Sequence, residues 1–213
     1  MDKEAILKWA HRRMAAADDT PLEPGYRYHH GLRVAALAVE LSERLALAVD
    51  RELLYVSGVL HDIGKSGYSG EAPHGPRGAE ILREETREWF SQEELERACR
   101  IVERHYGRPN SRWYKGQDKP VWPEEVLLVQ DADILDHFGC NHVWQAFFWA
   151  KHLRQSPQET LAYYWRNPKE HDWREEAKRA LNYDLSREEL SRRLERSDAF
   201  CREFAMEQAG TLV

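Results

Sequence analysis

The sequence predicts an all-α protein, and three observations lead to this expectation. Apolar residues recur at helical spacing almost everywhere, and no segment shows the sustained apolar–polar alternation of a half-buried strand. Neither Asn-Gly nor Asp-Gly, the strongest short signals of a β-hairpin, occurs in the chain. Three Ser-x-x-Glu segments have the form of the capping box that begins helices. We therefore expect about eight to ten helices in one domain that spans residues 1–213.

The first half of the chain divides into helices at recognisable boundaries. Val34, Leu37 and Leu41 form one apolar stripe, which indicates a long helix that packs by one face. Asp50 is a suitable N-cap for the helix that follows it, because its carboxylate can accept hydrogen bonds from the free N–H groups there. We predict helices over about 3–17, over about 27–48 and from 51 to about 61, and then a glycine-rich turn over about 64–76.

In the second half, capping boxes at Ser91, Ser156 and Ser186 predict the starts of three further helices. The segment 107–123 is predicted to be a long loop, and loops of this length in compact domains are often functional. The motifs that carry chemistry lie within about 26–140, and C-terminal helices follow over 141–213. We interpret the aromatic residues around 144–149 as core or as an oligomer contact rather than as a substrate site.

Composition and charge exclude several classes of protein. With 42% hydrophobic and 32% charged residues, the chain is not a disordered protein. Its net charge of -6 argues against a broad basic surface for a nucleic acid polymer. No apolar run approaches the ~18–20 residues of a membrane-spanning helix, and the N-terminus lacks the apolar stretch of a signal peptide. We therefore expect a cytoplasmic protein with no membrane partner. Cys99, Cys140 and Cys201 are widely spaced and are interpreted as small buried hydrophobes.

Three of the ten histidines fall on apolar helix faces. His30, His61 and His105 each stand four or seven residues from apolar residues of the same predicted helix, whereas His29 points away from that stripe. For any one of them, a satisfied core histidine or a surface histidine is the simpler interpretation. Three imidazoles directed at one core are costly unless their nitrogens are satisfied, and a bound metal ion satisfies them well.

Acidic residues complete the candidate cluster. Asp62 directly follows His61 at a predicted helix end, where both side chains can converge on one ion because Gly64 gives the turn its backbone freedom. The segment 124–137 is apolar over most of a helical wheel and is expected to be buried. Its polar sector either faces a cation, with Asp133 as the ligand, or is the solvated face of the helix. The members of this sector are Gln130, Asp133, Asp136 and His137, and Asp131 lies apart from them.

Three short segments together resemble a known family. They are His-Gly-Leu-Arg-Val from His30, His-Asp-Ile-Gly-Lys from His61, and Ala-Asp-Ile-Leu-Asp from Ala132. This order of His, His-Asp and Asp resembles the HD-domain superfamily of metal-dependent phosphohydrolases, over about residues 26–140. The resemblance implies an all-helical bundle in which one divalent ion, Mn, Fe, Co, Ni, Zn or Mg, is held by His30, His61, Asp62 and Asp133.

Two further segments resemble subgroups of that family that hold two metal ions. They are His-Gly-Pro-Arg-Gly-Ala from His74 and the segment Ile-Val-Glu-Arg-His-Tyr that contains His105. The resemblance implies that Asp62 bridges the two ions and that His74 and His105 bind the second. In single-metal members such histidines act instead as catalytic or substrate-binding groups, so one ion and two ions both remain open.

The resemblance implies a hydrolase that cleaves a phosphate ester of a small metabolite, above all a nucleotide, by attack of metal-activated water. Lys65 is placed to meet a phosphate, or is an exposed lysine of the turn. Arg33 either contacts phosphate or holds a carboxylate behind the ligands. The residues expected to take part in catalysis are Asp62, Lys65, His74 and Arg33. Those expected to bind substrate are Arg33, Lys65, Arg77, Arg112 and Lys115. Arg112 and Lys115 lie in a loop that either covers the site or is an ordinary solvated loop.

Two other functions remain as alternatives. Six candidate ligands are enough for a di-iron pair, which some HD-type oxygenases use. A non-catalytic metal-binding regulatory module is the other alternative, although such a module has no need of a buried ligand cluster. A homodimer is also open, because the sequence carries no signature that decides the oligomeric state.

Overall fold

The computed structural model describes residues 1–16, 20–68, 73–108, 121–165 and 173–212. These residues form ten α-helices and two short 3-10 helices, with no strand among them, which confirms the all-α prediction. None of the helices in these ranges combines the length and the apolarity needed to cross a bilayer. The helices are α1 (Lys3–Ala16), α2 (Tyr26–Arg44), α3 (Arg51–Leu60), η1 (Ile63–Lys65), α4 (His74–Glu85), η2 (Arg87–Trp89), α5 (Gln92–Arg104), α6 (Glu124–Asp136), α7 (Cys140–Leu153), α8 (Pro157–Tyr164), α9 (Trp173–Ala180) and α10 (Asp184–Gln208).

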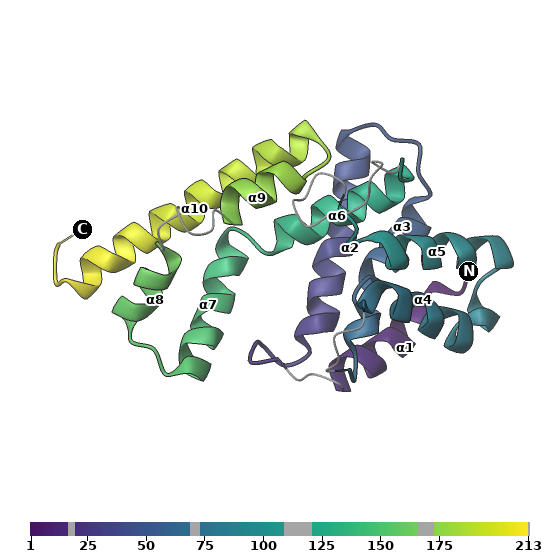
Figure 1. Ribbon diagram of the computed structural model, residues 1–213, viewed down its shortest axis with the longest axis horizontal. Coiled ribbons are helices and arrows are strands. Elements are labelled where there is room, and N and C mark those ends of the chain that lie inside the picture. Colours follow the sequence, from purple (N-terminus) through teal and green to yellow (C-terminus); the bar gives the residue numbers. More distant parts are fainter. Residues whose placement is uncertain (17–19, 69–72, 109–120, 166–172, 213) are drawn as a thin grey trace.

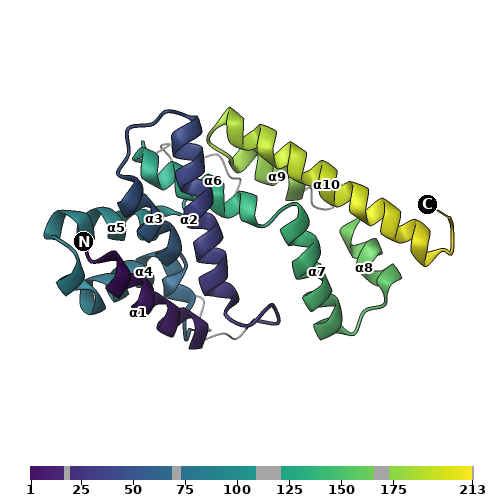
Figure 2. The same cartoon turned by 180° about the vertical axis from the view of Figure 1, so that it is seen from behind.

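From α1 to α8 the chain runs from one end of the molecule to the other, and α9 and the start of α10 return to the middle (Figure 1). Helices α1 to α5 form a bundle at one end, α6 lies in the middle beside α2, and α7, α8 and the C-terminal part of α10 form the other end. The view from behind shows the same division (Figure 2). Gly139 has a φ of 80°, a left-handed value that glycine adopts without strain, and it lies where the chain turns from α6 into α7.

Helices α2 and α3 pack closely through two glycines. A Cβ atom on Gly31 would lie 2.4 Å from the carbonyl oxygen of Val59, and one on Gly58 would lie 2.7 Å from the Cα of Ala35. Neither position therefore tolerates a side chain without a backbone shift. Because His30 and His61 adjoin these contacts on their own helices, the close packing brings the two imidazoles together, with ring centroids 4.9 Å apart.

Two hydrophobic cores flank this pair of helices. One core joins α1, α3, α4 and α5, and the other joins α2 to α6, α9 and α10. Asp131, on α6, belongs to the second core and accepts hydrogen bonds from the backbone N–H groups of Asn182 and Tyr183 at 2.8 and 3.1 Å. This carboxylate therefore anchors the start of α10 and does not take part in the histidine cluster.

Several predicted boundaries are confirmed and two are wrong. The Asp50 cap and the capping boxes at Ser91 and Ser156 are present. Helix α2 ends at Arg44 and not near 48, because the N–H groups of Ala46 and Leu47 bind the carbonyls of Glu43 and Ser42.

Ala46 takes a φ of 52° at this stop, a position where glycine is usual, so the sequence carries no warning of it. Ser186 is not a cap but a buried residue in the first turn of α10, which begins two residues earlier, directly after the segment that Asp131 anchors. Cys99 and Cys201 are buried as expected, whereas Cys140 is exposed.

Candidate metal centre

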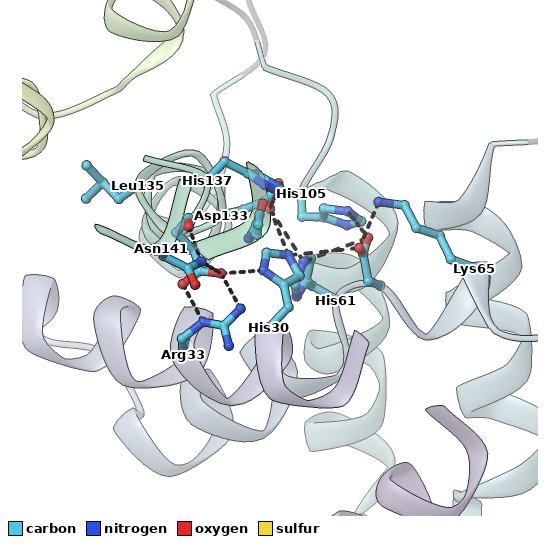
Figure 3. A network of polar contacts seen from close by, with 12 residues as sticks. His30, Arg33, His61, Lys65, His105, Asp133, Leu135, His137 and Asn141 are labelled. Atoms are coloured by element: carbon cyan, nitrogen blue, oxygen red, sulfur yellow. Dashed lines mark hydrogen bonds and ion pairs between the residues drawn. The ribbon is translucent and has the colours of Figure 1, made fainter. Parts of the chain in front are cut away.

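Five elements bring polar side chains together in the interior of the bundle (Figure 3). His30 comes from α2, Asp133 from α6, and His105 from the residue that ends α5. His61 and Asp62 lie where α3 ends, and His74 is the first residue of α4. The structure thus gathers all six residues that the sequence proposed as metal ligands.

His30, His61 and Asp133 lie close to one another on one side of the cluster. The Nε2 atom of His30 is 3.2 Å from Asp133 Oδ1, and the Nε2 atom of His61 is 3.7 Å from the same oxygen. Asp62 completes this side, since its Oδ1 is 3.8 Å from His61 Nε2 and its Oδ2 is 4.0 Å from His30 Nε2. These separations suit side chains that share a single ion. We call these three residues, His30, His61 and Asp133, the inner side.

His74 and His105 form the other side of the cluster, which we call the outer side. Their Nε2 atoms lie 3.3 and 3.5 Å from Asp62 Oδ1 and 2.9 Å from each other. Asp62 is therefore within reach of both sides. This is the arrangement that two ions with one shared carboxylate require.

Three of the imidazoles are held in one orientation by acceptors behind them. A carbonyl or an ionised carboxylate can only accept, so the hydrogen of each ring lies on Nδ1 and a neutral ring directs the Nε2 lone pair into the cluster. The Nδ1 contacts are Asp136 Oδ2 at 2.7 Å for His30, Gly58 O at 2.8 Å for His61 and Val102 O at 2.7 Å for His105.

The cluster passes a simple test of fit to a cation. His30 Nε2, His61 Nε2 and Asp62 Oδ1 are buried and, among the described residues, have no hydrogen-bond partner of good geometry. Buried polar atoms without partners are costly. A divalent ion held by these atoms, with the His30 ring deprotonated, removes that cost. The mixture of imidazole and carboxylate favours Mn, Fe, Co, Ni or Zn over Mg, which prefers oxygen ligands.

Both carboxylates of the cluster are ionised. Burial by itself raises the pKa of Asp62, but His61 and Lys65 more than offset it and hold that pKa well below the usual range. Burial likewise raises the pKa of Asp133, and Arg108 together with neighbouring histidines lowers it well below the usual range. The cluster therefore has two negative charges that a cation can neutralise.

The histidines of the two sides differ in their proton affinity. Burial lowers the pKa of His30, but its hydrogen bonds with Asp133 and Asp136 outweigh burial and raise it to about 9. For His74, burial and the nearby His105 lower the pKa to about 3. Burial is also the main reason why the pKa of His105 is lowered. The outer side is therefore neutral at pH 7 and ready to act as a ligand.

Arg33 holds a carboxylate behind the ligands, one of the two roles proposed for it. Its Nε donates to Asp136 Oδ1 at 2.8 Å and its Nη2 donates to Asp136 Oδ2 at 3.1 Å. Asn141 Nδ2 adds hydrogen bonds to the backbone oxygen and to Oδ2 of Asp136, at 2.7 and 3.3 Å. The His30 ring, which Asp136 orients, also stacks on Tyr26 at 5.5 Å. Such outer contacts fix the direction of a ligand.

A cleft of about 350 Å³ opens over the outer side, and Lys65 and Arg108 line it. Lys65 Nζ donates to Asp62 Oδ2 at 2.7 Å, and Arg108 pairs with Asp133. Two cations thus stand at the mouth of an anionic cluster. This placement suits an anionic ligand that reaches the cluster through the cleft.

The remaining predicted substrate contacts are placed differently. Arg77 donates to the carbonyls of Gly64 and Ser66 and lies over the Tyr68 ring, and it is not among the described residues that line the cleft. It therefore holds the turn that carries Lys65. Arg112 and Lys115 lie outside the described residues.

The sequence did not single out two residues of the site. Arg108 lies in the predicted loop, where no periodicity indicates which way a side chain points. His137, which the helical wheel placed in the polar sector, has its Nε2 3.4 Å from Asp133 Oδ1 and can join His30 and Asp133 in a metal-binding group. Its spacing of four residues from Asp133 was the available signal.

Known proteins resemble this chain in sequence and in fold. The family model of the HD domain matches residues 27–137. Ribonuclease Y of Pseudothermotoga lettingae is 36% identical over 107 residues, which make up 50% of this chain and 17% of that protein. The chain thus spans about a sixth of the length of this curated relative.

Solved structures with the same fold are more distant in sequence. Bacillus subtilis YpgQ, solved in complex with ADP, aligns with a TM-score of 0.61 at 19% identity and covers 96% of this chain and 97% of its own. An HD-superfamily hydrolase from Bacillus thuringiensis aligns with a TM-score of 0.63 at 20% identity and covers 97% and 96%. At these identities the similarity shows a shared fold that extends over nearly the whole chain.

Proposed function

This chain belongs to the HD domain family, and from that premise we propose that it is a metal-dependent phosphohydrolase that cleaves a phosphate ester of a small metabolite. One observation carries the proposal. Within the described part of the chain, buried nitrogen and oxygen atoms without hydrogen-bond partners converge beneath a cleft that two cationic side chains line. The buried atoms suit a divalent ion, and the cations suit the phosphate that the ion would bind.

His30, His61, Asp62 and Asp133 would hold the ion, and His74 and His105 would hold a second one with Asp62. Such an ion lowers the pKa of a bound water toward neutrality and neutralises charge on a phosphoryl oxygen. Asp136 and Arg33 keep His30 directed at the site. Burial of the cluster excludes bulk water, which strengthens every electrostatic interaction within it.

Lys65 and Arg108 bind the phosphoryl oxygens in this proposal. Each already forms an ion pair with a carboxylate of the cluster, so their charges lie next to the candidate ligands. His74 stands at the cleft with a pKa near 3 and is neutral at pH 7. It therefore serves as a ligand rather than as a general acid or base.

We favour a nucleotide as the substrate. YpgQ, which shares the fold, was solved with ADP, and the name ribonuclease Y describes an enzyme that cleaves phosphodiester bonds of a nucleic acid. The net charge of -6 argues against a long polyanion and for a small phosphate ester that a local pair of cations can hold. Monoester and diester substrates both fit these observations.

The experiment is a substrate screen with protein of known metal content. Protein stripped with a chelator and reloaded with Mn, Co, Ni, Zn or Mg is incubated with nucleotides and generic phosphate esters, and phosphate release is measured. We expect turnover with at least one metal, and its loss in Asp62→Asn. His29→Ala is the matched control, because His29 is exposed beside His30 and points away from the cluster. Full metal loading without turnover on any ester would refute the proposal.

The di-iron oxygenase remains a second candidate because Asp62 lies within reach of two histidine groups, as a shared ligand of an iron pair would. Iron analysis of the protein as purified, with absorbance spectra under nitrogen and under air, separates the two functions. An active, colourless and iron-free protein rules out the oxygenase. A metal-binding module without catalysis would bind metal and release no product under either condition.

A further inference from the structure

A second hollow adjoins the metal cleft. It has a volume of about 480 Å³ and lies among the residues that follow α6 and the helices α7, α8 and α9. Most of its large lining side chains are aromatic. We call it the aromatic pocket, and its main walls are Phe138, Trp149, Tyr163, Tyr164 and Trp173.

The aromatic pocket and the metal cleft share part of their walls, since His137, Phe138 and Trp173 line both hollows. The two hollows differ in charge. The cleft is lined by the charged side chains of Lys65, Arg108, Asp133 and Glu176, whereas the pocket has no lysine, arginine, aspartate or glutamate among the described residues that line it. A molecule with a charged end and an uncharged end would therefore match the pair.

The pocket walls suit a flat ring better than an alkyl chain. The Phe138 and Trp173 rings stack on each other, with centroids 5.2 Å apart and planes inclined by 16°. His142 also stacks on Trp173, at 5.4 Å and 21°. A planar ligand would therefore extend this stack from outside and would not enter between its rings. Aromatic side chains stack on nucleobases of any sequence, because every base has a π-face.

Polar groups at the pocket wall suit the edge of such a ring. Gln145, Gln155 and Thr160 are among the lining residues that carry hydrogen-bonding groups. A few such groups in an otherwise apolar hollow are typical of sites that fix the orientation of a ligand. Gln145 already donates to the Tyr26 hydroxyl at 3.5 Å and Thr160 to the carbonyl of Ser156 at 3.0 Å. A heterocyclic base, unlike a hydrocarbon, offers donors and acceptors to their remaining groups and to Gln155.

One wall of the pocket is partly open to solvent. Trp149 is 44% exposed. An exposed ring of this size forgoes the free energy that burial would supply, and a stacked ligand would recover it.

We propose that the aromatic pocket binds the planar, uncharged base of a nucleotide whose phosphate lies in the metal cleft. This inference rests on the proposed phosphate site and names the organic part of its substrate. It also revises the interpretation of the aromatic residues around 144–149. Trp149 belongs to the ligand site in this proposal, whereas Trp144, on the same helix, is 52% exposed and is not among the residues of the pocket.

The experiment measures binding to the metal-loaded protein by calorimetry, with two pairs of probes. AMP is compared with ribose 5-phosphate, which lacks only the base, and ADP with inorganic pyrophosphate, which lacks the whole nucleoside. We expect the probe with the base to bind at least about tenfold more tightly. In Trp149→Ala or Tyr163→Ala, the affinity for AMP should fall about ten- to hundredfold more than that for ribose 5-phosphate. Trp149→Phe should keep most of the preference.

Trp144→Ala is the matched control, because it removes an exposed indole from the same helix outside the pocket. Circular dichroism verifies that each variant is folded. Equal losses for both members of a pair would refute the aromatic pocket, as would a wild-type protein without preference for the base. If simple phosphate esters are cleaved without such a preference, the pocket fails and the phosphohydrolase stands. If AMP binds through its base and no ester is cleaved, the pocket stands and the phosphohydrolase fails.

Discussion

The two sides of the metal centre are built from the same side chains but are held in different ways. On the inner side, His30 is fully buried and is oriented by a chain of side chains that runs from Asp136 to Arg33. On the outer side, the His74 side chain is 25% exposed and lies on the wall of the cleft. From this difference we predict a resident ion on the inner side and an exchangeable ion on the outer side, which borders the cleft.

The largest effect is expected from Asp62→Asn, because this carboxylate serves both sides. Replacement by the amide removes one of the two buried negative charges and leaves the neighbouring histidines facing a neutral group. We expect loss of both ions by metal analysis and a fall in kcat/KM of more than about 100-fold, the upper end for residues behind the ligands. Full metal content and near-normal activity would show that Asp62 is not the shared ligand.

The next prediction separates the two sides. His30→Ala should reduce the metal bound per chain to near zero, because the resident ion loses a buried ligand. His74→Ala should remove only the exchangeable ion, so that one equivalent remains after dialysis. Metal analysis of both variants checks this difference. Equal losses in the two variants would break the comparison and indicate a single, symmetrical site.

Asp136→Asn tests how the inner side is held. The variant keeps the size of the side chain but removes the charge that pairs with Arg33 and accepts from His30 Nδ1. We expect metal affinity to fall about 10- to 100-fold, as is usual for partners behind a metal ligand. Competition with a chelator of known affinity measures the change.

The matched control for Asp136→Asn is Glu125→Gln, which makes the same kind of change in an ion pair with Arg97 at 2.9 Å on the far end of α6. It should leave metal affinity unchanged. An unaltered affinity in Asp136→Asn would mean that Asp136 supports the fold and does not orient His30.

Much of the inner side could be predicted from the sequence, because its residues occur in short segments whose helical phase is fixed by neighbouring apolar residues. His30 and His61 are examples, buried at 1% and 0% exposure. The position of Arg108 could not be predicted, since a residue in a loop has no periodicity to orient it. The end of α2 before Ala46 could not be predicted either, because the sequence has no glycine or proline at that point.

The aromatic pocket also lay beyond the sequence, for a different reason. Phe138, Trp149 and Trp173 come from three separate elements, and only the packing of α7 and α9 brings them to one hollow. Nothing in their positions along the chain distinguishes them from aromatic residues of an ordinary core. The all-α class and the candidate ligands His30, His61, Asp62 and Asp133 depend on local pattern, whereas the shape of a pocket depends on how the helices pack.

The smallest expected effect is the release of protons on metal binding, and it distinguishes the two sides most directly. In protein stripped of metal with a chelator, His30 has its pKa raised to about 9 and so carries a proton at pH 7, whereas His74 has its pKa lowered to about 3 and does not. The resident ion must therefore displace about one proton and the exchangeable ion none. The affinity of the protein for the resident ion should rise about tenfold per pH unit up to about pH 9 and level off above it. Calorimetric titrations in buffers of different ionisation enthalpy count these protons, and equal counts for the two ions would show that the sides do not differ in this way.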